Sequence, residues 1–125
     1  MRQHIHQHAE GGYREFKTRE LIKEELLRCG LESKHVKDCA KTGLVVDIVG
    51  SGAPSLEGCE MVALRADMDA LPMPENNPDL PYRSITDHAH MCGHDGHVVM
   101  MLACASVLIK RREMIPYGKC VRILF

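Results

Sequence analysis

The sequence predicts an α/β fold in which helices pack on a mixed, largely parallel sheet. Three runs rich in β-branched and apolar residues read as strands, at residues 42–50, 61–66 and 120–125. A longer apolar segment, residues 96–111, lies between the last two runs and has the length of a helix. A strand, a helix and a further strand in this order form a βαβ crossover. The 61–66 run is nearly all apolar, which is expected of a strand covered on both faces.

The remaining elements follow in chain order. Residues 1–12 are polar and end in two glycines, which favours a loop or a frayed terminus. Between residues 13 and 29 apolar residues recur at helical spacing, so we expect a surface helix that ends with Gly30 at its C′ position. Residues 51–57 have the composition of a turn. Prolines and asparagines make residues 72–91 a long irregular segment, and such a loop in a small domain is usually functional.

Composition bounds the class of protein. The chain has 125 residues, 45% apolar and 26% charged, with a net charge of −1, which suits one small globular domain. This near-neutral charge gives no argument for nucleic acid or an anionic membrane as a partner. The longest apolar run, residues 98–109, is shorter than a membrane span, and no apolar signal segment opens the sequence. We therefore expect a soluble, cytoplasmic protein.

Six cysteines invite a disulfide interpretation, but their positions favour free thiols. Cys104 lies within the predicted apolar helix and Cys120 opens an apolar strand, where buried free cysteines are common. Because no secretory segment is evident, we expect reduced thiols in a reducing compartment.

A cluster of metal-ligating side chains lies at residues 90–97, directly before the predicted helix. Only Gly93 separates Cys92 from His94, so a turning loop can point both side chains the same way. A thiolate with an imidazole suits a divalent ion, zinc first, with manganese, cobalt or nickel as alternatives. We interpret Cys92 and His94 as metal ligands. The alternative is a surface loop that happens to be rich in histidine.

The other polar side chains of this loop allow two roles each. His90 and His97 could be ligands or hydrogen-bonding partners, and Asp95 could be the carboxylate that orients a ligating histidine. No metal role is assigned to the three alternating histidines of the polar N-terminus, His4, His6 and His8.

Two carboxylates, Asp67 and Asp69, follow the second predicted strand. Ligands of open α/β sheets bind at the carboxyl ends of the strands, and alternation places both side chains on one side. We therefore expect both aspartates at the site, although strand-ending aspartates are also common in turns. A catalytic metal centre generally needs three or more protein ligands. No glutamate pair suited to general-base work lies near the loop, and Glu75 has no assigned role.

Two motifs resemble those of a known family. Residues 65–72 (RADMDALP) and 90–97 (HMCGHDGH) look like motifs of the metal-dependent amidohydrolases of the aminoacylase/carboxypeptidase clan. The most similar branch contains hippurate hydrolase, N-acyl-amino-acid amidohydrolases and the plant indoleacetyl-amino-acid hydrolases. Residues 6–10 (HQHAE) resemble the opening motif of that branch, and residues 121–125 resemble the strand before its next motif.

The resemblance implies roles for individual residues. Cys92 and His94 would bind metal in a site for two divalent ions, zinc or manganese first. Asp69 would be the catalytic aspartate beside the metals, and Asp67 would stand where other branches have a metal-binding histidine. The implied reaction is hydrolysis of the amide bond of an N-acyl amino acid, with hippurate-like or auxin-conjugate-like substrates.

The resemblance also implies that residues 1–125 are the N-terminal part of a metallopeptidase-like catalytic domain. The paired glutamates, the remaining histidine ligands and the dimerisation domain follow this region in the family and have no counterpart here. The full-length parent would be a homodimer, and this chain alone is expected to be inactive. Two alternatives stay open. One is a non-catalytic metal-binding or interaction module, or a decayed gene product, derived from such an enzyme. The other is a small α/β domain whose Cys92–His94 pair binds nothing.

Overall fold

The fold is an α/β arrangement with a mixed sheet, as predicted. The computed structural model describes residues 1–52 and 56–125, so the turn expected at 51–57 lies partly outside the described residues. The elements, in chain order, are α1 (Arg2–Gln7), α2 (Phe16–Arg28), η1 (Ser33–His35), β1 (Val36–Cys39), β2 (Gly43–Val49), β3 (Glu60–Arg65), α3 (His94–Lys110), η2 (Arg112–Met114) and β4 (Lys119–Leu124).

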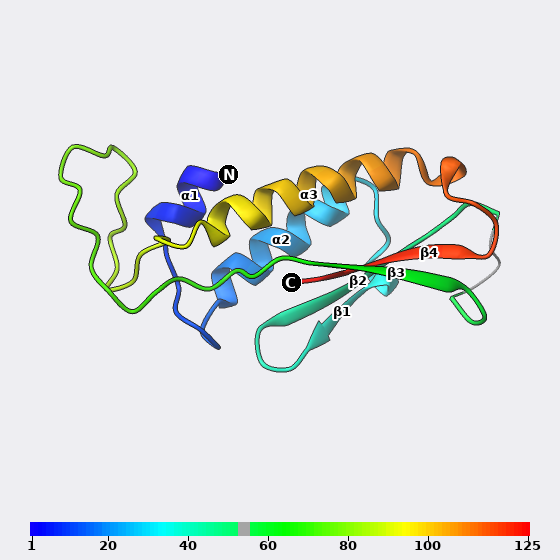
Figure 1. The fold of residues 1–125 in the computed structure, drawn as a ribbon, viewed down its shortest axis with the longest axis horizontal. Coiled ribbons are helices and arrows are strands. Elements are labelled where there is room, and N and C mark those ends of the chain that lie inside the picture. The colour runs from blue at the N-terminus through cyan, green and yellow to red at the C-terminus, as the bar shows by residue number, and fades with distance from the viewer. Residues whose placement is uncertain (53–55) are drawn as a thin grey trace.

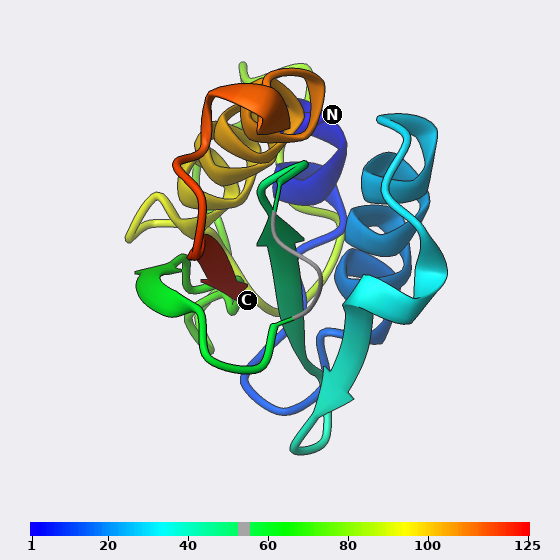
Figure 2. The same cartoon turned by 90° about the vertical axis from the view of Figure 1, so that its right-hand side faces the viewer.

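The sheet has the strand order β1-β2-β4-β3, and the three α-helices lie over one of its faces (Figures 1 and 2). β3 and β4 are parallel and flank α3 in the chain, so the predicted βαβ crossover is confirmed. The other two pairings among the described strands, β1 with β2 and β2 with β4, are antiparallel. The sheet is therefore less parallel than the sequence suggested, because a β1–β2 hairpin precedes the crossover.

The core lies between the sheet and the two longer helices. β2 directs Leu44, Val46 and Ile48 toward the helices, as the alternation of side chains along a strand requires. The buried face of α3 follows helical spacing and consists of Val98, Leu102, Ala105 and Ile109. α2 adds Ile22 and Leu26 to the same cluster, and α1 adds Ile5. Gly30 follows α2 with φ +96°, as predicted for its C′ position.

Three local predictions are wrong. Residues 1–12 contain α1, because Ile5 and His6 on one side of this short helix are buried. β3 is not covered on both faces. It lies at the edge of the sheet and Val62 is 58% exposed, so its apolar composition reflects strand propensity. Cys104 is exposed on the outer side of α3, whereas Cys120 is buried as expected.

Strand β1 was not predicted, because its four residues contain a single aliphatic side chain, that of Val36. It forms the other edge of the sheet, where burial is slight, so its sequence carries no alternating pattern. All six cysteines lie in the described part of the chain, and none of them forms a disulfide bond there. Over the described residues, no helix is both long enough and apolar enough to cross a bilayer.

A long irregular segment, residues 72–88, connects β3 to the 90–97 loop, as predicted. It lies at the end of the molecule where α1 meets the start of α3 (Figure 1). Isolated bridges tie its flanks, since Leu71 pairs with Ala89 and Ala70 pairs with Gly11. The segment that follows β3 is thereby held beside both α1 and the start of α3.

Candidate metal centre

The 90–97 loop turns into α3 at Gly93, which has φ +80° and is the N-cap residue of the helix. Glycine adopts this left-handed conformation without the steric cost of a Cβ. The Gly93 carbonyl accepts hydrogen bonds from the N–H groups of Gly96 (2.9 Å) and His97 (3.1 Å), which begins the helix. His94 and Asp95 therefore stand in the first turn, where the helix dipole favours negative charge.

Asp69 holds the ring of His94. The Nδ1 atom of His94 lies 2.9 Å from both the carbonyl oxygen and the Oδ1 atom of Asp69. Both neighbours are acceptors, so Nδ1 is the donor, and in the neutral imidazole Nε2 then carries the lone pair. A carboxylate that fixes the tautomer in this way is the usual partner of a metal-binding histidine. The sequence placed both residues at the site, and the structure brings them into direct contact.

The two aspartates after β3 line the same hollow, which has a volume of about 330 Å³. Arg65 also lines this hollow and pairs with Asp67. Cys92 is exposed. The ring of His97 lies 5.3 Å from the ring of His94, measured between centroids.

The donor set fits half of a metal site. Across residues 1–52 and 56–125, no three histidine, cysteine, aspartate or glutamate side chains converge closely enough to hold a metal ion. The Cys92 thiol and the His94 imidazole, whose ring Asp69 holds, are nevertheless donor types that suit a divalent ion.

His90 is a buried imidazole, only 4% exposed. Neither of its ring nitrogens has a hydrogen-bond partner among the described residues. Burial lowers the pKa of His90, although the nearby Asp95 carboxylate acts in the opposite direction. Buried polar atoms without partners cost free energy, so an ion or a water molecule bound at this ring would be stabilising.

Asp95 was a candidate for the carboxylate that orients a ligating histidine. In the structure its carboxylate pairs with side chains of α1, and the carboxylate that contacts the His94 ring is that of Asp69. The Oδ2 atom of Asp95 lies 2.9 Å from His6 Nδ1 and 2.9 Å from Arg2 Nη1. Burial by itself would raise the pKa of Asp95, but hydrogen bonds from His6 and from a backbone N–H lower it overall. Asp95 is thus an ionised group that joins the start of α3 to the N-terminal helix.

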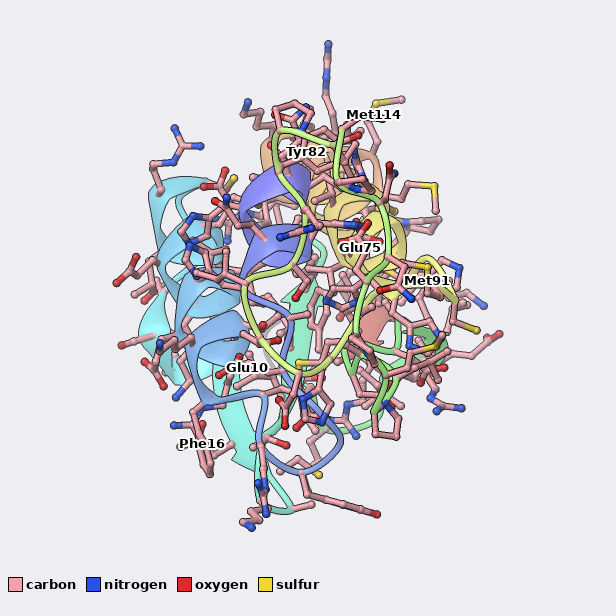
Figure 3. The ribbon with its side chains drawn as sticks, turned by 90° about the vertical axis from the view of Figure 1, so that its left-hand side faces the viewer. Glu10, Phe16, Glu75, Tyr82, Met91 and Met114 are labelled. Atoms are coloured by element: carbon pink, nitrogen blue, oxygen red, sulfur yellow. The ribbon has the colours of Figure 1, made fainter. Side chains whose placement is uncertain are left out.

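Sequence reasoning missed the partners of Asp95. The second ring nitrogen of His6, Nε2, lies 3.2 Å from Glu75 Oε1. Glu75 reaches inward from the loop that passes over α1 (Figure 3). The polar composition of residues 1–12 predicts a loop or frayed terminus, whereas His6 is a buried residue of α1. Its place in the motif at residues 6–10 was the one available signal.

Comparisons with known proteins agree with this architecture. The structure superposes on that of the YXEP protein of Bacillus subtilis, described as a dinuclear metal-binding peptidase, with a TM-score of 0.84 and 33% identity. That match covers 100% of this chain and 33% of the other. Thermostable carboxypeptidase 1 of Saccharolobus solfataricus is 40% identical over an alignment of 126 positions, which covers 100% of this chain and 30% of that protein. IAA-amino acid hydrolase ILR1-like 2 of Arabidopsis thaliana is 41% identical over 113 residues, covering 90% and 24% respectively.

The fold thus matches that of a solved M20-family peptidase. This chain spans about a third or less of the length of the relatives it matches. The model of peptidase family M20/M25/M40 matches residues 63–125, which include the second half of β3, the 90–97 loop, α3 and β4. The chain belongs to this family.

Proposed function

We propose that residues 1–125 are the N-terminal part of the catalytic domain of a metal-dependent amidohydrolase. The proposed reaction is hydrolysis of the amide bond of N-acyl amino acids, of the hippurate or auxin-conjugate type. The parent would work as a homodimer in the cytoplasm, and its dimerisation domain would lie outside these residues. The contact between Asp69 and His94, two residues from Cys92, carries this proposal.

The proposed ligands are Cys92 and His94, with Asp67, His90 and His97 as alternative or supporting donors. Two divalent ions would occupy the complete site, zinc or manganese first and cobalt or nickel as alternatives. When bound there, a divalent ion supplies Lewis acidity toward an amide carbonyl and lowers the pKa of water. Asp69 keeps the His94 proton on Nδ1, which leaves the lone pair of Nε2 available to bind a metal ion.

The relatives support the choice of substrate class. One similar protein is named as an IAA-amino acid hydrolase and another as a carboxypeptidase, and both names describe cleavage beside an amino acid. The hollow lined by Arg65, Asp67 and Asp69 gives the N-terminal part a polar wall near the proposed ligands. Arg65 is a candidate for contact with a substrate carboxylate, because guanidinium groups bind carboxylates well.

A Co²⁺ titration tests the metal assignment. Thiolate coordination gives Co²⁺ a charge-transfer absorption in the near ultraviolet, so the wild-type chain should develop this band. The band should be lost in Cys92→Ser and weakened in His94→Ala. Cys104→Ser is the matched control, because Cys104 is another exposed thiol, about three helical turns into α3. A band that persists in Cys92→Ser would contradict the assignment.

An activity assay separates the enzyme from a non-catalytic metal-binding module, the second candidate. We expect the 125-residue chain to hydrolyse N-acyl amino acids negligibly, and a product extended to the length of its relatives to hydrolyse them in a metal-dependent way. An extended product that binds metal without hydrolysing any such substrate would favour the module.

A further inference from the structure

One buried side chain of α1, His6, contacts both ends of the segment that carries Cys92. His6 is 8% exposed, and its Nδ1 atom lies at hydrogen-bond distance, 2.9 Å, from Oδ2 of Asp95. Asp95 is the residue directly after His94 in the chain. The ring of His6 also lies beside the ring of His90, with centroids 6.2 Å apart. His6 therefore anchors this segment by a hydrogen bond three residues after Cys92, and its ring lies beside the segment two residues before Cys92.

Helix α1 is itself fixed from the opposite side. Glu75 accepts from His6 Nε2 at 3.2 Å and from the backbone N–H of Ser84 at 2.7 Å. The guanidinium of Arg2 also donates to Asp95, and it lies over the ring of Tyr82 at 4.9 Å from the centroid. The irregular loop of residues 72–88 thus holds α1 in place through Glu75 and Tyr82 (Figure 3), and α1 in turn contacts residues 90–95.

We propose that His6 is a positioning residue for the candidate metal ligands. It fixes the backbone of residues 90–95 from the side of α1, while Asp69 fixes the His94 ring from the side of β3. Cys92 is exposed, so the position of its thiol depends on the segment on either side of it. The inference rests on the proposed metal site and adds a role for α1 in assembling it.

The expected loss of metal affinity on removing the His6 contacts can be taken from the usual contribution of positioning groups in metal sites. Groups that hold a ligand without touching the metal typically contribute 10- to 100-fold to metal affinity, because they keep donors in a productive geometry. Loss of the His6 contacts should therefore weaken Co²⁺ binding by about 10- to 100-fold. The Cys92-dependent absorption should remain at saturating Co²⁺, because neither proposed ligand is removed.

Asparagine and glutamine at position 6 can separate positioning from simple burial. The amide nitrogen of asparagine stands close to where Nδ1 of histidine lies, so His6→Asn can keep the bond to Asp95. The amide nitrogen of glutamine reaches the position of Nε2, so His6→Gln can keep the bond to Glu75 instead. Both variants bury an amide of similar size in place of the imidazole.

The experiment is a Co²⁺ titration that follows the Cys92-dependent absorption of His6→Ala, His6→Gln and His6→Asn. Each variant is measured well below its own unfolding temperature, which is determined separately. We expect His6→Ala and His6→Gln to bind about 10- to 100-fold more weakly than wild type, and His6→Asn to recover most of the affinity. His4→Asn is the matched control, since it changes an exposed histidine on the same helix.

The outcomes that overturn the inference are distinct. If the wild-type chain shows no Cys92-dependent Co²⁺ absorption, the proposed metal site fails and the inference fails with it. If the wild type binds and all His6 variants match its affinity, the metal site stands and the positioning role is refuted. If His6→Asn and His6→Gln are weakened equally, the Asp95 contact is not what matters, and the role assigned to His6 is refuted as well.

Discussion

The hydrogen bond between Asp69 and His94 makes a quantitative prediction. Asp69→Asn keeps an oxygen acceptor at 2.9 Å from Nδ1 but removes its charge. Hydrogen bonds to charged groups contribute about 1.5–3 kcal/mol, compared with about 0.5–1.5 kcal/mol for neutral pairs. The carboxylate is 41% exposed, so the lower end of that difference applies, about 1 kcal/mol. This corresponds to a loss of metal affinity of about fivefold.

Asp69→Ala should cost more than Asp69→Asn but should not abolish binding, because the Asp69 backbone carbonyl also accepts from Nδ1. The assay is a Co²⁺ titration at neutral pH with thermal unfolding measured in parallel. Asp79→Asn, which changes an exposed aspartate of the long loop, is the matched control and should leave the affinity unchanged. Equal affinities for wild type, Asp69→Asn and Asp69→Ala would refute the reasoning that Asp69 prepares His94 for metal.

Three further predictions concern stability. Burial by itself would raise the pKa of Glu75, but hydrogen bonds from a backbone N–H and from His6 lower this pKa overall. The ionised Glu75 therefore stabilises the fold above the ordinary glutamate pKa, and this contribution is lost as the pH falls through the lowered pKa. Urea unfolding should therefore show wild type losing stability below about pH 4.5, with a flatter profile for Glu75→Gln; identical profiles would contradict the assignment. Gly93→Ala should destabilise the chain by about 1 kcal/mol because φ is +80° at this position, and an unchanged unfolding temperature would argue against that conformation. Ile22→Ala, at a fully buried site, should lower the free energy of unfolding by about 2–5 kcal/mol. Val107→Ala, at a side chain that is 62% exposed, should lower it by less than about 1 kcal/mol, and similar losses for the two variants would contradict the position of the core.

The sequence was sufficient to predict the elements that form the crossover. β3, α3 and β4 have strong apolar signals and distinct lengths, and the glycine after α2 marks its end. The elements that were missed carry weak local signals. α1 has six residues, four of them histidine or glutamine, and it is stabilised by buried contacts of Ile5 and His6 that no local pattern reveals.

Some residues of the candidate site could likewise be identified from the sequence, and others only from the packing of the elements. Cys92, His94 and Asp69 could be chosen from residue types and spacing, since ligand residues and glycines gather in two short motifs. The pairing of Asp95 with His6 joins residues 89 positions apart, so it depends on the packing of α1 against α3. Glu75 could not be placed, because its role follows from how the long loop passes over α1.

X-ray absorption spectroscopy of the zinc-loaded chain tests the central claim most directly. The account predicts a coordination shell that includes one sulfur at about 2.3 Å and at least one imidazole nitrogen at about 2.0 Å. The sulfur should be lost in Cys92→Ser, and the imidazole contribution should be reduced in His94→Ala. A shell made of oxygen and nitrogen alone in the wild-type chain, or a sulfur that persists in Cys92→Ser, would contradict the assignment of the metal site to the 90–97 loop.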